Sequence, residues 1–244
     1  MKRMIALAAV GLVTLTACGL QLDTTERHQA TTFPHPGGTL TVKTRVGDLR
    51  VVPGDASGVK VDRWLQGSAG EPGKSTWALE NGRLSLRTDC TVFFATCGAR
   101  YTVHLPPGVK LLVEGGDERV TLSGLDQDVT VATTGGDILA DGLSGVLRLR
   151  TSEGLIRSRA TRSADVRAHS RDGAVRVQFA APPGRVDALS REGGVVVTVP
   201  EGEYGITAES RNGRTDAELK DAGKGSERTI VARSVDGDVR VSRT

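Results

Sequence analysis

The sequence contains few aromatic residues and few of the side chains that usually bind metals or carry redox chemistry. Of its 244 residues only 3% are aromatic, and the chain has 3 Cys, 4 His and 2 Met. This composition excludes a thick core built on large rings. The histidines are scattered with no ligand spacing, so we expect no metal site and no cofactor. They are His28, His35, His104 and His169.

Neither sign of charge dominates the chain. Lys and Arg number 32 against 29 Asp and Glu, which gives a formal net charge of +3. This excess is too small to indicate a nucleic-acid partner, and we expect none. Glycine, in contrast, is abundant, with 31 residues. Together with the low aromatic content, it favours many short strands joined by tight turns around a thin interior of Val, Leu and Ala.

The first residues have the composition of an export signal. Lys2 and Arg3 form a positive region, and residues 4–15 (MIALAAVGLVTL) form an apolar run that is too short to span a bilayer comfortably. The run ends in LTAC at residues 15–18, which resembles the lipobox of bacterial lipoproteins. The alternative is an ordinary signal peptide with an incidental Cys18.

The lipobox resemblance implies that Cys18 carries lipid, including palmitate, and that the signal peptide 1–17 is removed before it. A chain modified in this way is exported and anchored by its lipid to the outer face of the bacterial cytoplasmic membrane. Residues 18–38 are polar, lack a sustained strand pattern and end in Pro and Gly, so we expect a lipidated Cys followed by a flexible tether.

The two remaining cysteines lie close together in CTVFFATC. Exported proteins meet an oxidising environment, so we expect a disulfide between Cys90 and Cys97. The alternative is a metal pair, but six intervening residues do not match the CxxC spacing of zinc sites, and no further ligands accompany them.

A glycine-centred unit recurs through the rest of the chain. Apolar residues lie seven and five positions before the glycine, a Ser or Thr lies three before it, and in most units another apolar residue lies two after it. This alternation has a period of two on both sides of the glycine, so each unit is predicted to be a strand, a tight turn and a second strand. From residue 136 onward the turn glycines are Gly136, Gly154, Gly173, Gly193, Gly213 and Gly237.

A repeat of about 20 residues with two strands and two corners is typical of one coil of a β-solenoid, because a single coil cannot bury its apolar face alone. We therefore predict an all-β, single-chain β-solenoid over residues 39–244. Residues 55–105, which hold Trp64 and Trp77, do not follow the coil pattern closely. We expect them to form a less regular N-terminal cap or an antiparallel sheet packed on the first coils.

The repeated units also resemble a known family. The hydroxyl-x-x-Gly-x-apolar units, the SGL and DGL corners at residues 123–125 and 141–143, and the LPPG phrase are similar to the β-strand-repeat family of bacterial adhesin-like proteins. The resemblance covers residues 39–244. It implies a β-solenoid of the cell envelope, a binding or sensing role of unknown detail, and no catalytic residues.

Two sets of charged residues are candidates for a site. The recurring acids near the turn glycines offer no paired acid and base, so we expect no enzyme activity. Four arginines fall at positions that alternation turns outward, two of them three residues after a turn glycine and two in another slot before it. Stacked coils could align them into a candidate strip for an anionic ligand. The alternative for these arginines is a solvated face that discourages edge-to-edge aggregation. The four are Arg148, Arg157, Arg167 and Arg176.

These observations predict a cell-envelope lipoprotein with a non-enzymatic, adhesin-like or interaction role. Its expected partners are the membrane, through the lipid anchor, and either a cell-wall polymer or a membrane protein. The first alternative is an accessory or sensory component of a membrane stress-response system. A polysaccharide-processing β-helix enzyme is a more remote alternative, because some β-helix proteins cut polysaccharides with clustered carboxylates.

Overall fold

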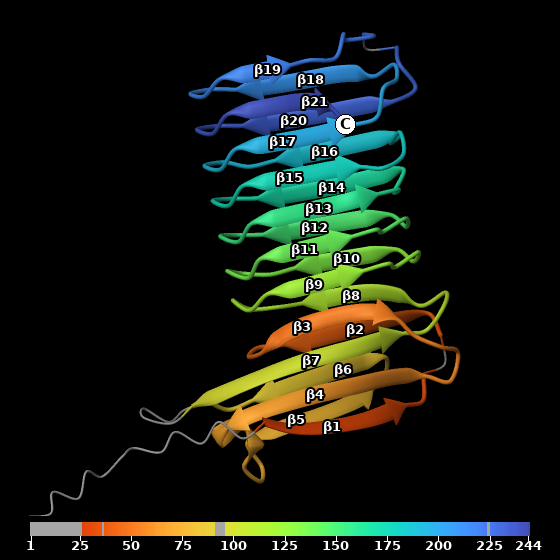
Figure 1. The fold of residues 1–244 in the computed structure, drawn as a ribbon, viewed down its shortest axis with the longest axis vertical. Helices are drawn as coiled ribbons and strands as arrows, with labels where there is room; N and C mark the ends of the chain where they lie inside the picture. The colour runs from red at the N-terminus through yellow and green to blue at the C-terminus, as the bar shows by residue number, and fades with distance from the viewer. Residues whose placement is uncertain (1–25, 36, 91–95, 224) are drawn as a thin grey trace, which may run out of the picture.

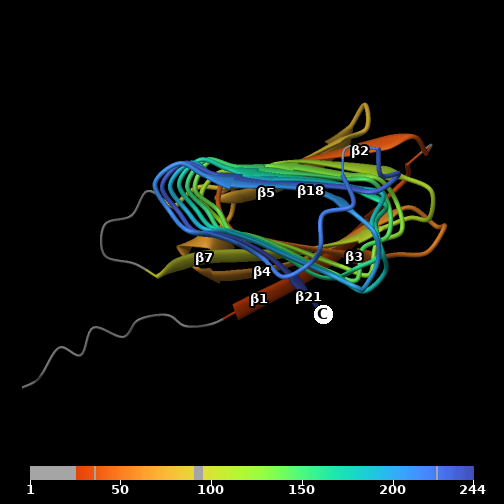
Figure 2. The same ribbon diagram turned by 90° about the horizontal axis from the view of Figure 1, so that it is seen from above.

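A computed structural model describes residues 26–35, 37–90, 96–223 and 225–244. Within these ranges the chain forms two large β-sheets that face each other across a narrow core (Figures 1 and 2). No helix in these ranges has the length and apolar character needed to cross a membrane. The predicted signal peptide 1–17 and the predicted lipidation site Cys18 lie outside the described residues.

Twenty-one strands make up the two sheets. The 11-stranded sheet contains, in spatial order, β1 (Glu26–Phe33), β4 (Val59–Gly67), β7 (Cys97–Leu105), β3 (Asp48–Pro53), β9 (Val120–Ser123), β11 (Ile138–Asp141), β13 (Ile156–Thr161), β15 (Val175–Phe179), β17 (Val195–Val199), β21 (Val239–Arg243) and β19 (Thr215–Ala217). The 10-stranded sheet contains β18 (Gly205–Ser210), β20 (Thr229–Ser234), β16 (Arg185–Leu189), β14 (Asp165–Ser170), β12 (Leu147–Thr151), β10 (Val129–Ala132), β8 (Lys110–Glu114), β2 (Thr39–Thr44), β6 (Arg83–Thr88) and β5 (Ser75–Glu80). A short 3-10 turn, η1 (Ser68–Gly70), follows β4.

Each coil contributes one strand to each sheet, and successive coils pair in parallel. In the 11-stranded sheet Ile138 lies opposite Ile156, which lies opposite Val175, so that equivalent positions of the repeat stack directly. These side chains point inward and are fully buried, whereas their neighbours along each strand face solvent. The prediction of a β-solenoid built from coils of about 20 residues is therefore confirmed.

The order of the coils departs from chain order at both ends of the stack. The last coil of the chain, β20 and β21, lies between β16–β17 and β18–β19. The chain therefore builds the outermost coil first and then returns to fill the gap beneath it (Figure 1). At the opposite end β2 and β3 pair with β8 and β9 on one side and with β6 and β7 on the other. Neither exchange follows from the sequence period.

The end of the stack beside β2 and β3 is covered by less regular strands. β4 pairs antiparallel with both β1 and β7, and β5 forms an antiparallel pair with β6. Residues 55–105 contain β4 to β7, and with β1 they cover the first coil as Figure 1 shows.

Part of the segment predicted as a flexible tether is a strand. Residues 26–33 form β1, which pairs with β4 along its full length, so the tether prediction is wrong for these residues. The reason is that β1 is held by polar contacts rather than by an apolar stripe. Gln29 accepts a hydrogen bond from Nε of the buried Arg63 at 2.7 Å, and Arg63 also lies 3.9 Å from the centre of the Trp77 ring.

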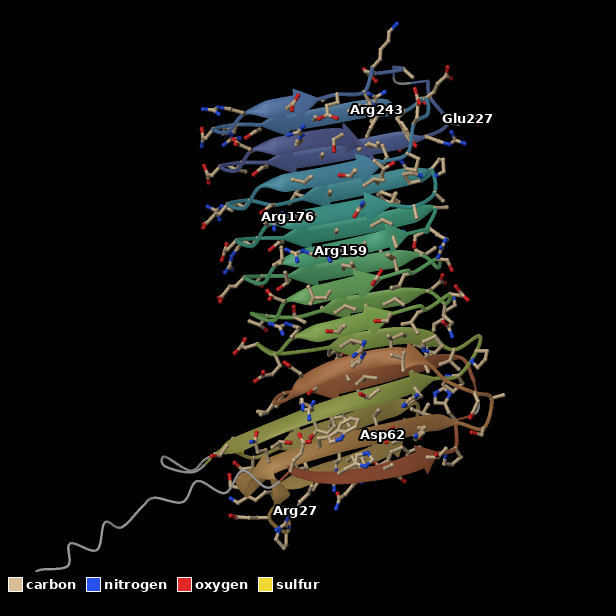
Figure 3. The ribbon with its side chains drawn as sticks, viewed as in Figure 1. Arg27, Asp62, Arg159, Arg176, Glu227 and Arg243 are labelled. Carbon is tan, nitrogen blue, oxygen red and sulfur yellow. A yellow bond between two sulfur atoms is a disulfide. The ribbon has the colours of Figure 1, made fainter. Side chains whose placement is uncertain are left out.

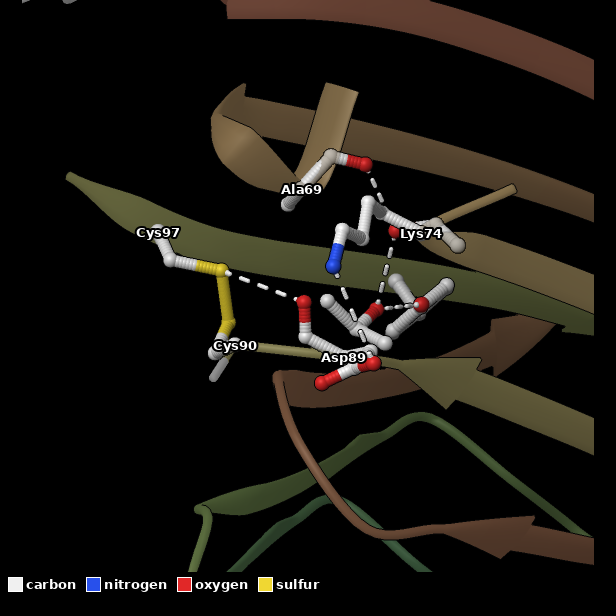
Figure 4. Close-up of a disulfide and its surroundings, with 8 residues drawn as sticks. Ala69, Lys74, Asp89, Cys90 and Cys97 are labelled. Atoms are coloured by element: carbon white, nitrogen blue, oxygen red, sulfur yellow. Dashed lines mark hydrogen bonds and ion pairs between the residues drawn. A yellow bond between two sulfur atoms is a disulfide. The ribbon is translucent and has the colours of Figure 1, made fainter. Parts of the chain in front are cut away.

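Cys90 and Cys97 form a disulfide, with their Cα atoms 5.6 Å apart (Figure 4). The bond joins the segment after β6 to the first residue of β7, and these two strands belong to different sheets. The cross-link therefore fastens the two sheets together within the cap. Close by, the hydroxyl groups of Thr88 and Tyr101 are hydrogen-bonded at 2.6 Å.

Candidate functional site: an arginine pocket on the 11-stranded sheet

The turn glycines stack directly on one another at one corner of the solenoid. A Cβ atom added to Gly173 would lie 1.9 Å from the carbonyl oxygen of Gly154, and one added to Gly193 would lie 2.5 Å from that of Gly173. None of the six turn glycines has a positive φ, so close approach of backbones rather than a left-handed turn requires glycine here. Gly47 in the first coil differs, with a φ of 107°.

The recurring hydroxyl groups connect the stacked corners. Ser170 Oγ accepts a hydrogen bond from the Gly173 amide at 3.0 Å and donates one to the Gly154 carbonyl in the adjacent coil at 3.1 Å. The same pair of bonds recurs at Ser190. We call this set the hydroxyl–glycine ladder; besides the six turn glycines, its members are Thr151, Ser170, Ser190, Ser210 and Ser234. Thr133 differs, because its hydroxyl donates to the carbonyl of its own turn glycine, Gly136, at 2.8 Å. These hydroxyl groups serve the backbone and are not placed as nucleophiles.

The acids near the turn glycines also bond to neighbouring turns. Asp137 accepts a hydrogen bond from the Leu155 amide at 2.9 Å, and Asp238 accepts one from the Arg214 amide at 2.8 Å. Asp172 instead pairs with Arg171, whose hydrogen bond lowers the pKa of the Asp172 carboxyl. Within the described ranges, no group of three or more His, Cys, Asp or Glu side chains could hold a metal ion.

The four arginines of the predicted strip lie on two different sheets. Arg148 and Arg167 lie side by side on the 10-stranded sheet, where Arg148 pairs with Asp165 at 2.5 Å and Arg167 with Asp187 at 3.2 Å. Arg157 and Arg176 lie side by side on the 11-stranded sheet. A single strip of all four is therefore wrong, because the solenoid core separates the two pairs and carboxylates neutralise one of them.

Arg157 and Arg176 line a pocket of about 340 Å³ together with Arg159, Gln178, Val196 and Thr198. The pocket lies across β13, β15 and β17. A β-bulge in β13 shapes it: the register with β15 shifts between Ser158 and Thr161. Ala160 in this bulge has a φ of 47°, a conformation that is uncommon for a residue with a side chain.

The bulge explains why Arg159 joins the pocket. It gives β13 one extra residue against β15, so both Arg159 and Ala160 are exposed. Figure 3 shows Arg159 and Arg176 projecting from neighbouring strands. Arg159 was not predicted from the sequence, because the repeat template does not extend through residues 158–161 (SRAT). The two consecutive residues without an apolar partner at this point were the available signal.

The three arginines of the pocket form no ion pair within 4.0 Å with any described residue. Asp141 lies opposite Arg159 in the adjacent coil but does not reach it. Further along the same row of outward positions, Arg240 is paired with Asp216 and Glu218. The pocket is thus a local concentration of uncompensated positive charge on a chain whose charges nearly balance.

A second polar cluster lies on the outer face of the cap. The carboxylate of Asp62, whose side chain is 9% exposed, contacts His28 at 2.9 Å, His104 at 3.1 Å and Lys60 at 3.4 Å. Burial raises the pKa of Asp62, but hydrogen bonds from these three partners outweigh burial and hold the pKa below its ordinary value. Trp64 stacks on His28 with ring centres 4.8 Å apart. Figure 3 labels Asp62 in this cluster, which fastens β1 and β7 to β4.

Comparison with known proteins identifies the family. The family model described as Toastrack DUF4097 matches residues 108–242, more than half of the chain. The chain belongs to this family. The matched residues run from β8 through β21 and include the arginine pocket and the hydroxyl–glycine ladder. None of the curated proteins matches the chain.

Solved structures of bacterial proteins are similar to this Toastrack chain along most of its length. An adhesin candidate from Bacteroides fragilis aligns with a TM-score of 0.49 and 12% identity, covering 90% of this chain and 97% of the other. One from Parabacteroides merdae aligns with a TM-score of 0.45 and 9% identity, covering 91% and 98%. A candidate cell adhesion protein from Clostridium sporogenes aligns with a TM-score of 0.41 and 11% identity, covering 90% and 100%.

Proposed function

We propose that the chain is an exported bacterial lipoprotein whose β-solenoid is a non-enzymatic, adhesin-like interaction module of the cell envelope. The observation that carries this proposal is the position of β1. The first described strand after the predicted lipidation site Cys18 is the outermost strand of the 11-stranded sheet. A lipid on Cys18 would therefore hold the stack by one end and leave both sheet faces and the far coils accessible.

The length of the stack is consistent with a module that is anchored at one end and exposed along its sides. Eleven strands spaced about 4.8 Å apart give a stack about 48 Å long. The chain between Cys18 and Glu26 spans at most about 27 Å when fully extended. The coils beyond the cap could thus reach past the lipid headgroups into the surrounding envelope. Each buried methylene contributes about 0.8 kcal/mol, so two or three acyl chains on Cys18 are enough for stable anchoring.

The groups that an enzyme would need have structural partners. The ladder hydroxyls bond to turn amides and carbonyls, and Asp137 and Asp238 accept backbone hydrogen bonds. These contacts support an interaction role and give no support to polysaccharide processing.

Fractionation of cells tests the anchored display. The wild-type chain should be found in the membrane fraction and be released only by detergent, whereas the Cys18→Ser variant should be found in soluble exported fractions. Cys90→Ser is the matched control, because it removes a cysteine of the folded part and should leave the chain in the membrane. Equal distribution of wild type and Cys18→Ser would contradict the anchor.

The second candidate function is an accessory or sensory component that contacts a membrane protein. The polar cluster around Asp62 favours it, because this cluster lies on the cap, at the end nearest the predicted anchor. A photocrosslinker placed at Gln66 on the cap and, separately, at Gln178 in the middle of the stack distinguishes the two. Recovery of one membrane protein from Gln66 alone would support this candidate, and crosslinking to wall material from Gln178 alone would support the adhesin-like module.

A further inference from the structure

We infer that the pocket formed by Arg157, Arg159 and Arg176 binds a polyol-phosphate polymer. This inference rests on the proposed function in that it names the ligand of the proposed module. The pocket combines three features that together select such a ligand: uncompensated guanidinium groups, an apolar floor, and neutral hydrogen-bonding groups beside them.

The charge in the pocket calls for an anion from outside the chain. Some exposed cations of the outer sheet faces have carboxylate partners: Arg240 has Asp216 and Glu218, and Arg167 has Asp187. Others, such as Arg50 and Arg150, stand without an ion pair to any residue that the structure describes, but neither lines this pocket. The three pocket arginines have no such partner among the described residues, although they share two adjacent strands. The three guanidinium groups repel one another, and an anion bound between them would replace this repulsion by attraction.

The spacing of the arginines fits phosphate groups. Arg157 and Arg176 are register partners on strands about 4.8 Å apart, and Arg159 lies two residues along β13, about 6.6 Å away. Guanidinium groups bind phosphate oxygens through two parallel hydrogen bonds, and at this spacing they can hold one phosphate from two sides or two successive phosphates. A phosphodiester polymer presents such charges at regular intervals.

The rest of the pocket fits a polyol. Val196 follows Arg157 and Arg176 in their row, where a third arginine would otherwise stand, and supplies an apolar surface for the carbon chain of the ligand. Gln178 and Thr198 line the same pocket and offer an amide and a hydroxyl group. The Gln178 carbonyl and the Thr198 hydroxyl can accept hydrogen bonds from ligand hydroxyls between the phosphates, which guanidinium groups cannot do because they only donate.

The position of the pocket favours a polymer over a lipid headgroup. β13, β15 and β17 lie six to eight strand spacings from β1, which is roughly 29 to 38 Å along the stack. The pocket also opens on a sheet face, to the side of the stack, and not toward the anchored end. A polymer that extends through the envelope can run across this face.

The test uses residues 19–244, which include every residue that the structure describes. The probes are a short glycerol-phosphate oligomer, poly-L-glutamate, and vesicles of phosphatidylcholine and phosphatidylglycerol. The pocket variant replaces Arg157, Arg159 and Arg176 by Gln. The matched control replaces Arg191, Arg211 and Arg214 by Gln, which removes the same charge from exposed corner positions that have no ion pairs with described residues. Thermal melting confirms that both variants are folded.

The glycerol-phosphate oligomer is expected to bind the wild-type chain at low salt. The pocket variant should bind the oligomer at least tenfold more weakly, whereas the affinity of the control variant should fall by less than about threefold. A tenfold loss corresponds to about 1.4 kcal/mol. Binding should weaken as salt rises, because ion pairs with a polyanion release counterions. Equal losses in the pocket and control variants would overturn the inference, as would equal affinity for poly-L-glutamate or binding to vesicles without binding to the oligomer.

Failure of this inference differs from failure of the proposed function. If purified cell wall retains the wild-type chain and the pocket variant equally, the module binds the envelope and the assigned pocket is wrong. If the oligomer binds through the pocket but cell wall retains nothing, the pocket is right and the wall-binding module is wrong.

Discussion

The tight stacking of the turn glycines predicts a large effect for Gly173→Ala. The added Cβ would lie 1.9 Å from the Gly154 carbonyl oxygen, 2.5 Å from its carbonyl carbon and 2.7 Å from the Glu153 carbonyl oxygen. Close C···O contacts in proteins are about 3.3 Å or longer, so the two coils must separate locally by about 1.4 Å. The contacting atoms are backbone, and no side-chain rotation can relieve the clash.

That separation would break the ladder bonds at this corner. The Ser170 Oγ–Gly154 O distance, now 3.1 Å, would exceed the range of a hydrogen bond, and the bond from the Ile156 amide to the Ala174 carbonyl at 3.0 Å would be stretched as well. Each buried polar group left without a partner costs about 1–3 kcal/mol, so we expect a loss of about 3 kcal/mol or more. At about 2–4 °C per kcal/mol for a chain of this size, the melting temperature should fall by about 6–12 °C.

Thermal melting followed by far-ultraviolet circular dichroism measures this effect. Gly225→Ala is the matched control, because no atom lies within 4 Å of its added Cβ and its φ is not positive. The control should melt at the wild-type temperature. If Gly173→Ala also melts at the wild-type temperature, the coils are not in the close contact described and the reasoning is refuted.

Three further predictions concern single contacts. Ser170→Ala removes both ladder bonds of one coil and should lower the free energy of unfolding by about 2 kcal/mol in urea titrations. Ser170→Thr keeps a hydroxyl group at this position, so most of that stability should remain. Cys90→Ser opens the loop to Cys97 and should cost about 2.5 kcal/mol, an effect that a reducing agent reproduces in wild type only. Asp62 has a lowered pKa, so its stabilisation is fully present above pH 3.8 and is lost as pH falls through its folded-state pKa; urea midpoints should show this loss in wild type and not in Asp62→Asn.

The β-solenoid was predictable because every coil needs the same glycine turn at the same corner. Stacked backbones at the corner exclude every side chain, so glycine recurs at a fixed offset from the ladder hydroxyl and from buried residues such as Val166 and Val175. That constraint is local and is therefore visible in the sequence. At these positions the close approach of backbones, and not a positive φ, is what requires glycine.

The order of the coils could not be predicted, because pairing between coils is not local. All coils share the same corner and the same inward positions, so the repeat pattern fits several orders equally well. One signal was present: Thr215 occupies a position that is apolar in the other coils, and it is exposed in the outermost coil. The interval of 24 residues between Gly213 and Gly237 also gives the chain enough length to pass back around that coil.

The arginine pocket was predictable only in part. Alternation placed Arg157 and Arg176 in one outward slot, three residues after a turn glycine, and Arg148 and Arg167 in another slot, before it. It did not show that the two slots face away from each other on different sheets. The partners that neutralise the second pair, Asp165 and Asp187, come from adjacent coils and become neighbours only through stacking. The bulge that adds Arg159 breaks the alternation on which the prediction depended.

Retention of residues 19–244 by purified cell wall, measured at low and high salt, tests the proposed envelope-binding module most directly. The account predicts that the chain sediments with the wall at low salt and is released as salt rises, because the attraction between the arginine pocket and an anionic polymer is screened. A chain that stays in the supernatant at low salt, or that sediments equally at both salt concentrations, would contradict it.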